Sequence, residues 1–238
     1  MGGGLMEILA VIPARGGSKG IKKKNIKILC GYPLIYFTIK TALSSKLINN
    51  TVVSTDDIEI KKISENYGAD VPFLRSEELS SDSALAVPTI KDALLKSELF
   101  YGKKFDYVLM LQPTTPLRSV EDIDNSINLM KDNNTDGVIS IVNVNNWHPY
   151  KMKIFKENLL FDFIDTGLEN PPRQSLPPVY MVNGAVYGCK RDVLVNKNSF
   201  KGDSCSGYVM PESRSVNIDS EVDFILAEYF LSKQNSNA

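Results

Sequence analysis

The chain has 238 residues, of which 43% are apolar and 23% charged, and its formal net charge at pH 7 is −1. This composition predicts a globular protein with one large domain and a full core. Because the net charge is near zero, any basic site must be local. The three cysteines are far apart and form no CxxC pair, which predicts reduced thiols in a cytoplasmic protein.

Membrane and nucleic-acid partners are not expected. No apolar run approaches the roughly 20 residues of a membrane-spanning helix, and the N-terminus lacks a secretion signal. Aromatic residues are not interleaved with Lys and Arg on one face, as a nucleic-acid surface would require. His148 is the single histidine and fits a structural turn, so Ser-His-Asp or Cys-His catalysis is a poor fit.

The segment from Ile8 to Asn25, ILAVIPARGGSKGIKKKN, starts as an apolar run and becomes cationic after Pro13. It predicts a buried strand that leads into a glycine-rich loop with Arg15 and several lysines. Glycines let backbone N–H groups face an anion, and Arg and Lys neutralise its charge, so a polyphosphate is the expected ligand. The loop matches neither GxxxxGK[ST] nor GxGxxG, and alone it fits a basic surface turn equally well.

Strand-like and helix-like segments then alternate as far as residue 144. Helices are expected over 32–45, 58–67, 85–99 and 120–131, and strands over 51–54, 69–74, 106–111 and 137–144. This alternation predicts an α/β fold in three layers, with a mostly parallel sheet covered by helices. Ligands of such sheets bind outside the carboxyl ends of the strands. The loops expected at that edge are 15–25, TDD at 55–57, SSDS at 80–83 and QPTTPLR at 112–118.

The pattern changes over about 145–180. Residues 151–155 and 159–164 alternate like a hairpin around Glu157-Asn158, and the proline-rich PPRQSLPP follows. A strand is expected at NGAVY and a last strand over 215–218, before a closing helix over 221–231. Residues 196–209 are polar and loop-like. We treat 1–238 as one domain, with about 145–180 and 196–210 as insertions that cap the substrate or contact a second subunit.

Three further features carry candidate chemistry. Asp219 follows the last expected strand, where its carboxylate fits Mg²⁺, although an N-cap is the commoner role. QPTTPLR offers an amide, two hydroxyls and the Arg118 guanidinium, or it is a plain turn with Arg118 in solvent. PPRQSLPP presents Arg173 and Gln174 to an anionic substrate, or it is a surface crossover.

Seven motifs occur together in order: IPARGGSKGIKKKN, STD, LRSEELSSDS, LQPTTPLR, PPRQSLPP, NGAVY and VNIDSEVDF. As a set they resemble the acylneuraminate cytidylyltransferases, the CMP-sialic acid synthetases, whose bacterial members also activate legionaminic acid. The likeness runs from Ile8 to Glu228. It implies the Rossmann-like fold of nucleotide-diphospho-sugar transferases with a small dimerisation excursion. CMP-Kdo synthetases match less well, since they carry an acidic residue at the position of Thr114.

The resemblance implies a reaction. CTP and a nonulosonic acid, a nine-carbon 2-keto sugar acid, would give a CMP-sugar and pyrophosphate through in-line attack of the anomeric hydroxyl on the α-phosphorus. Such transfers depend on positioning and charge neutralisation. The resemblance also implies Mg²⁺ as cofactor and a cytoplasmic homodimer, in which an arm of one subunit closes the sugar site of the other.

The resemblance assigns roles to particular residues. Those implied to contact CTP are Arg15, Gly16, Ser18, Lys19, Lys24, Asn25, Arg75 and Ala84. Those implied to lie near the sugar acid are Gln112, Lys151, Arg173, Tyr187 and Phe200, the last across a subunit contact. Asp219, with Asn217, would hold Mg²⁺, and the residues implied in catalysis are Arg15, Lys24 and Asp219.

Three positions depart from the family pattern. Asn217 replaces an aspartate in the metal motif, and Ala86 replaces a serine of the base pocket. Met181 or Val182 stands where sialic acid enzymes carry an arginine, which points to a less charged sugar pocket and a legionaminate-like substrate. Two other functions stay open: a CTP-binding protein without turnover, and a nucleotidyltransferase for Kdo or a sugar 1-phosphate. No residue stands out as a general base.

Overall fold

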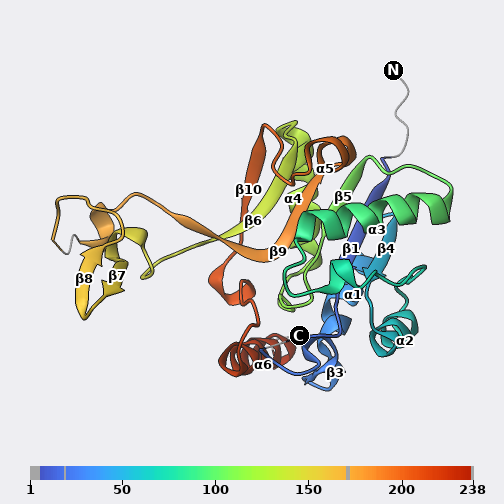
Figure 1. Cartoon of the computed structure of the whole chain (residues 1–238), viewed down its shortest axis with the longest axis horizontal. Coiled ribbons are helices and arrows are strands. Elements are labelled where there is room, and N and C mark those ends of the chain that lie inside the picture. Colours follow the sequence, from blue (N-terminus) through green and yellow to red (C-terminus); the bar gives the residue numbers. More distant parts are fainter. Residues whose placement is uncertain (1–5, 19, 170–171, 237–238) are drawn as a thin grey trace.

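The computed structural model describes residues 6–18, 20–169 and 172–236. A six-stranded sheet runs through the molecule in the order β10-β6-β9-β5-β1-β4 (Figure 1). Its strands are β1 (Ile8–Pro13), β4 (Asn50–Ser54), β5 (Tyr107–Met110), β6 (Gly137–Asn143), β9 (Tyr180–Lys190) and β10 (Cys205–Val209). β1 pairs in parallel with β4 and β5, and β6 with β10, whereas β9 is antiparallel to β5 and β6. The predicted mostly parallel sheet is confirmed.

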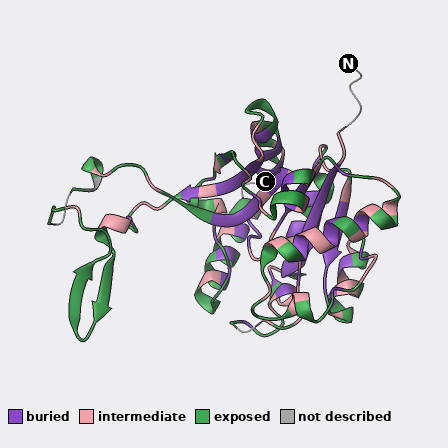
Figure 2. Cartoon of the chain, turned by 45° about the horizontal axis from the view of Figure 1, so that its top comes forward, coloured by how far each residue is buried: buried purple, intermediate pink, exposed green. Residues whose placement is uncertain are grey.

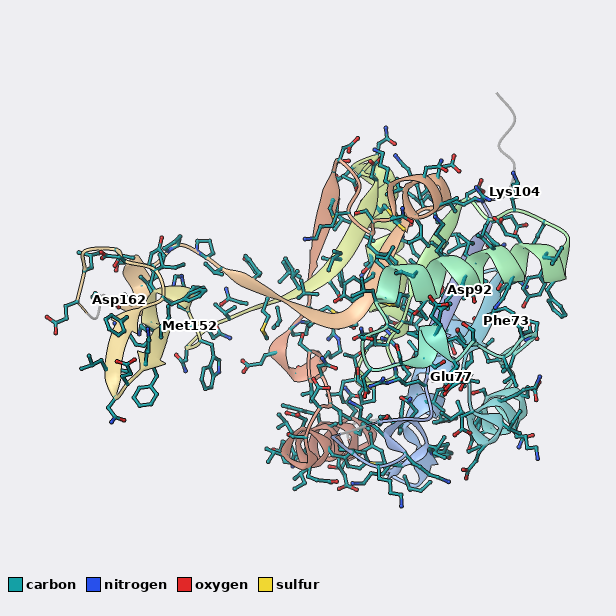
Figure 3. The ribbon with its side chains drawn as sticks, in the orientation of Figure 1. Phe73, Glu77, Asp92, Lys104, Met152 and Asp162 are labelled. Carbon is teal, nitrogen blue, oxygen red and sulfur yellow. The ribbon has the colours of Figure 1, made fainter. Side chains whose placement is uncertain are left out.

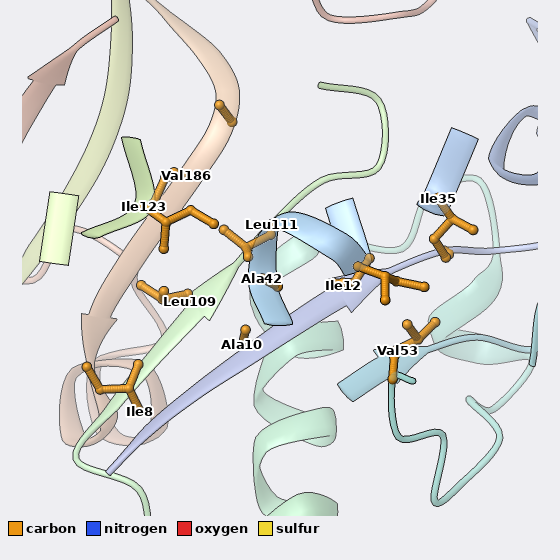
Figure 4. Packing of buried hydrophobic residues seen from close by; sticks show 14 of the residues in the cluster. Ile8, Ala10, Ile12, Ile35, Ala42, Val53, Leu109, Leu111, Ile123 and Val186 are labelled. Carbon is orange, nitrogen blue, oxygen red and sulfur yellow. The ribbon is translucent and has the colours of Figure 1, made fainter. Parts of the chain in front are cut away.

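Helices cover both faces of the sheet. They are α1 (Leu34–Ser44), α2 (Ile58–Asn66), α3 (Ala86–Tyr101), α4 (Val120–Asp132), α5 (Arg191–Lys197) and α6 (Glu221–Ser236). Successive side chains of a strand point to opposite faces. Ile8, Ala10 and Ile12 of β1 therefore pack with α1, α2 and α4 (Figure 4), while Leu9 and Val11 pack with α3 and α5. Burial on both faces explains the continuous apolar run of β1.

Two small hairpins stand outside this sheet. β2 (Ile28–Leu29) and β3 (Tyr32–Pro33) precede α1, and Leu29 packs with Phe224 of α6. β7 (Lys153–Lys156) and β8 (Leu159–Asp162) form the predicted hairpin, whose turn residues Glu157 and Asn158 have φ of 51° and 64°. This second pair, here called the projecting hairpin, stands apart from the sheet and is exposed along its length (Figures 1 and 2). Met152 and Asp162 mark it in Figure 3.

Three predicted elements near the sheet are wrong. Residues 215–218 form no strand, because the Ile218 N–H donates to the Thr114 carbonyl (2.8 Å) in a loop rather than to a sheet neighbour. Part of the predicted loop 196–209 is the edge strand β10, which β6 pairs in spite of its polar sequence. Residues 69–74 make isolated bridges, Val52 to Asp70 and Thr55 to Leu74, rather than a continuous strand.

Arg118 of QPTTPLR has neither of its two predicted roles. Its side chain is buried, and Nη1 donates to the Ala185 carbonyl (2.6 Å) and to Thr115 Oγ1 (2.9 Å), while Nη2 donates to Thr38 Oγ1 (2.8 Å). Burial lowers the pKa of Arg118 to about 9, so the guanidinium stays charged at neutral pH. Arg118 thereby ties the loop after β5 to both α1 and β9.

We expect Arg118→Ala to lower the free energy of unfolding by about 3 kcal/mol, because buried acceptors on three elements lose a charged donor. Urea denaturation measures this loss. Lys62→Ala, on the exposed side of α2, is the control and should change stability by less than about 0.5 kcal/mol. An equal, small loss in both variants would contradict the structural role of Arg118.

Candidate active site

A cleft of about 510 Å³ opens at the carboxyl ends of β1 and β5. Four separate stretches line it: the glycine loop after β1, residues 75–90, the loop after β5, and the segment before α6. Its polar lining residues are Arg15, Ser18, Lys24, Asn25, Arg75, Ser81, Asp82, Thr89, Gln112, Thr114, Asn217 and Asp219. The parallel strands bring these loops to one edge, as the sequence predicts.

The glycine loop packs against the TDD turn at 55–57. The Gly16 N–H donates to Asp56 Oδ1 (3.0 Å), and Asn25 Nδ2 donates to the Arg15 carbonyl (2.9 Å). Asp57 Oδ1 caps α2 by accepting from the N–H groups of Glu59 (2.7 Å) and Ile60 (3.1 Å). A Cβ at Gly16 would lie 2.6 Å from Asp57 Oδ2, so the loop can approach the turn this closely only with glycine.

Two cations of this loop face carboxylates of distant segments. Arg15 Nη1 lies 2.8 Å from Asp82 Oδ1, with both side chains partly exposed. Lys24 Nζ lies 3.0 Å from Asp219 Oδ1 and donates to the Ile218 carbonyl at 2.7 Å. The Lys24 side chain is 14% exposed and that of Asp219 73%. Lys24 is thus fixed in place while the carboxylate of Asp219 stays open to a ligand.

Asn217 and Asp219 fit a magnesium ion as oxygen donors. Both are exposed and line the cleft. No group of three or more His, Cys, Asp or Glu side chains that suits a metal occurs among the described residues. A site of this kind suits Mg²⁺, which binds one or two carboxylates and takes its other ligands from water and phosphate oxygens.

Arg75 lies at the base of the cleft. Its Nε donates to Ser54 Oγ (3.1 Å) and its Nη2 to the Ser54 carbonyl, at the end of β4. Burial lowers the pKa of Arg75 to about 10. Because Ser54 fixes one edge of the guanidinium, the orientation of Arg75 in the lining of the cleft is set by the end of β4.

The opposite wall depends on the NGA motif of β9. Gly184 has φ of +81°, and a Cβ there would lie 2.6 Å from Gln112 Oε1. Asn183 is buried, accepts from Ser140 Oγ (2.6 Å) and donates to Ser215 Oγ (3.0 Å). The motif therefore sets both the space for Gln112 and the course of the segment that leads to Asn217.

Most of the predicted site residues meet in this cleft. Those that line it are Arg15, Ser18, Lys24, Asn25, Arg75, Ala84, Gln112, Asn217 and Asp219, and Gly16 adjoins Arg15 in the same loop. Ala86, which stands where the family pattern has a serine of the base pocket, also lines the cleft. Lys19 lies outside the described residues, and so does the side chain of Arg173.

Three residues expected near the sugar acid lie elsewhere. Lys151 ends a 3₁₀ turn (Pro149–Lys151) beside the projecting hairpin and is exposed. Tyr187 and Phe200 pack against each other with ring centroids 5.7 Å apart, in the core beneath α3. Phe200 is only 7% exposed, which corrects the expectation that it reaches across a subunit contact. An aromatic in a polar stretch indicates burial as readily as contact with a partner.

Asp56 and Asp82 belong to the site, although the sequence indicates no role for either side chain. Their motifs, TDD and SSDS, predict loops at the correct edge. A motif gives the place of a loop and not the direction of each side chain, so these two carboxylates are found only in the structure.

The chain belongs to the cytidylyltransferase family, whose model matches residues 9–171. It is 37% identical to the post-translational flagellin modification protein B of Campylobacter coli, over 98% of this chain and 99% of that protein. It is 35% identical to a CMP-N,N'-diacetyllegionaminic acid synthase of Campylobacter jejuni, over 97% of each. A CMP:2-keto-3-deoxy-manno-octonic acid synthetase complexed with CTP shares the fold, with a TM-score of 0.72 at 16% identity over 96% of this chain and 99% of that one. The predicted family is confirmed.

The described residues include no helix long and apolar enough to cross a membrane.

We expect Gly16→Ala to destabilise the chain by about 1 kcal/mol, because the new methyl group displaces the Asp57 carboxylate that caps α2. Gly17→Ala is the matched control, since no described atom lies within 4 Å of a Cβ at that position. Thermal or urea unfolding compares the two variants. Equal stabilities would mean that Asp57 and the loop do not constrain each other.

Proposed function

We propose that this chain transfers CMP from CTP to the anomeric hydroxyl of a nonulosonic acid, giving a CMP-sugar and pyrophosphate. One observation carries the proposal: Arg15 and Lys24, the oxygens of Asn217 and Asp219, and the Gln112 amide line the same cleft of a cytidylyltransferase. Relatives named for CMP-legionaminate synthesis match nearly the full length of the chain. The proposed reaction uses CTP in the cytoplasm, and the thiols of Cys30, Cys189 and Cys205, none in a disulfide, agree with that compartment.

The cationic groups suit the triphosphate. Arg15 and Lys24 lie on one loop and line the cleft, so negative charge that develops on the leaving pyrophosphate would meet fixed positive charge. In the free chain these cations pair with Asp82 and Asp219, and on binding CTP they would exchange the carboxylates for phosphate oxygens. Mg²⁺ held by Asn217 and Asp219 would supply further charge neutralisation when bound.

The acceptor site is proposed beside Gln112. This amide lies against Gly184, where the pairing of β9 with β6 shifts register, and Met181 and Val182 of the same strand are 59% and 45% exposed. Apolar side chains at these positions suit the deoxygenated, N-acylated tail of a legionaminate better than the polyhydroxylated tail of sialic acid. We therefore propose legionaminate-type acids as the preferred acceptors.

Pyrophosphate release with CTP and Mg²⁺ tests the reaction. N-acetylneuraminic, legionaminic and Kdo acids would be offered separately, with ATP, GTP and UTP as nucleotide controls. Turnover with CTP and legionaminic acid, at a kcat/KM above that for sialic acid, is expected. CTP binding without turnover on any acid would favour a non-catalytic CTP-binding protein, the function that the missing carboxylate at Asn217 favours.

Asp219→Ala should lower kcat by about 10²-fold, since it removes the carboxylate proposed to hold the metal. Asn217→Asp should reduce the Mg²⁺ concentration needed for half-maximal rate, because a carboxylate binds Mg²⁺ more strongly than an amide oxygen. Asn158→Asp in the projecting hairpin adds the same charge away from the cleft and is the control. A magnesium requirement unchanged in Asn217→Asp would contradict the assignment.

We further propose a homodimer formed through the projecting hairpin. Large apolar side chains are exposed on both of its strands, among them Ile154 (49%), Phe155 (69%), Leu160 (67%) and Phe161 (51%). A two-stranded hairpin without a core is at best marginally stable in water, and an apolar surface of this kind is typical of subunit contacts.

Phe155→Asp should shift the chain from dimer to monomer in sedimentation velocity, because a buried charge would oppose association. Phe100→Asp is the matched control, since Phe100 is a 59% exposed aromatic on α3. If both variants sedimented as the unmodified chain does, the hairpin would not be the subunit contact.

A further inference from the structure

Asp122 is a buried carboxylate that contacts no part of the cleft and is not explained by the proposed reaction. It lies in the first turn of α4 and is fully buried. Its Oδ2 accepts from the Ser119 N–H (3.0 Å), while its own N–H donates to Ser119 Oγ (3.2 Å), which forms a capping box. A helix cap needs no buried charge, so the remaining partners of this carboxylate decide its role.

Arg214 forms a two-pronged ion pair with Asp122. Arg214 Nε lies 2.9 Å from Oδ2 and Nη2 lies 2.9 Å from Oδ1, and the hydroxyl of Tyr208 donates to Oδ1 at 3.2 Å. Burial raises the pKa of Asp122, whereas the hydrogen bonds from Arg214 and Ser119 lower it. Together the hydrogen bonds outweigh burial, so the pKa of Asp122 lies below its ordinary value. Forked pairs of this kind fix orientation as well as distance.

The two partners adjoin two different segments that line the cleft. Asp122 lies in the first turn of the helix that follows the Gln112–Arg118 loop, and Arg214 closes the 3₁₀ turn (Glu212–Arg214) three residues before Asn217. Residues 215–220 have no regular secondary structure. Beyond Arg214 the two segments are joined again where the Ile218 N–H donates to the Thr114 carbonyl (2.8 Å).

We propose that Asp122 and Arg214 are positioning residues that hold Asn217 and Asp219 in register with the Gln112–Arg118 loop. The ion pair fixes the start of an irregular segment whose own backbone offers few internal constraints, and the Ile218 bond fixes its end. Loss of the pair would let the metal-binding oxygens drift relative to Lys24 and Gln112. This proposal rests on the proposed function, since it assumes that Asn217 and Asp219 face the metal and the nucleotide.

The Arg191–Glu98 pair is a matched control within the same chain. Arg191 Nε and Nη2 lie 2.6 and 2.9 Å from the two Glu98 oxygens, and the side chains are 17% and 10% exposed. This pair joins the start of α5 to α3, and neither residue lines the cleft. Arg191→Met therefore removes a forked ion pair of the same chemistry without touching the segment before α6.

The test compares Arg214→Met, Arg214→Lys and Arg191→Met in the full-length chain. Hydrogen–deuterium exchange of the peptide over 215–220 is measured without ligand, and kcat, KM for CTP and the Mg²⁺ requirement are measured in parallel. Arg214→Met should speed exchange of that peptide, lower kcat about tenfold and raise the Mg²⁺ requirement to a similar extent. Arg214→Lys, which keeps the charge but loses the fork, should fall between Arg214→Met and the unmodified chain.

Arg191→Met should lower the melting temperature without these changes. If Arg214→Met altered exchange and kinetics no more than Arg191→Met does, the positioning role would be overturned. If the unmodified chain showed no transfer at all, the proposed function would fail, while exchange over 215–220 would still decide whether the ion pair orders that segment.

Discussion

Burial of β1 on both faces is the constraint from which the rest of the molecule follows. Leu9 and Val11 fill one side of the sheet and Ala10 and Ile12 the other, so the strand must lie between neighbours and beneath helices on both sides. Its carboxyl end must then emerge at an edge, where Ala14 continues directly into the glycine loop. The position of the site is therefore a consequence of packing, because the carboxyl end of the buried strand fixes where the loop and its cations lie.

The site is closed by contacts between segments far apart in the sequence. Lys24 follows the first strand of the chain, yet its ammonium group lies on the Ile218 carbonyl and on Asp219, just before the last helix. Lys27 adds an ion pair with Glu221 and lies over the Phe224 ring, 4.5 Å from its centroid. α6 and the β2–β3 hairpin thus pack as one unit that supports the glycine-loop side of the cleft.

Carboxylates accompany several donor groups of the site. Asp56 accepts from the Gly16 N–H, Asp82 pairs with Arg15, and Asp219 pairs with Lys24. Without such partners, a concentration of positive charge in one cleft would repel itself and destabilise the free chain. The Arg15–Asp82 pair is partly exposed and contributes little free energy, so the proposed triphosphate would replace it at small cost. Arg118 and Asp122 are different, because they are buried and serve to hold the walls of the cleft rather than a ligand.

The sequence by itself determined most of the alternation of strands and helices up to residue 144, the common edge for the four loops, and the group of Arg15, Lys24, Gln112 and Asp219. These follow from local periodicity and from motifs whose chemistry is carried by neighbouring residues. Only the tertiary structure decided that β10 is a strand and 215–218 is not, since strand pairing depends on a partner from elsewhere in the chain. The tertiary structure also decided that Arg118 and Phe200 are buried. It placed Asp82 and Asp122 in ion pairs with arginines from distant segments. The direction and burial of a side chain depend on distant segments, which one-dimensional spacing does not encode.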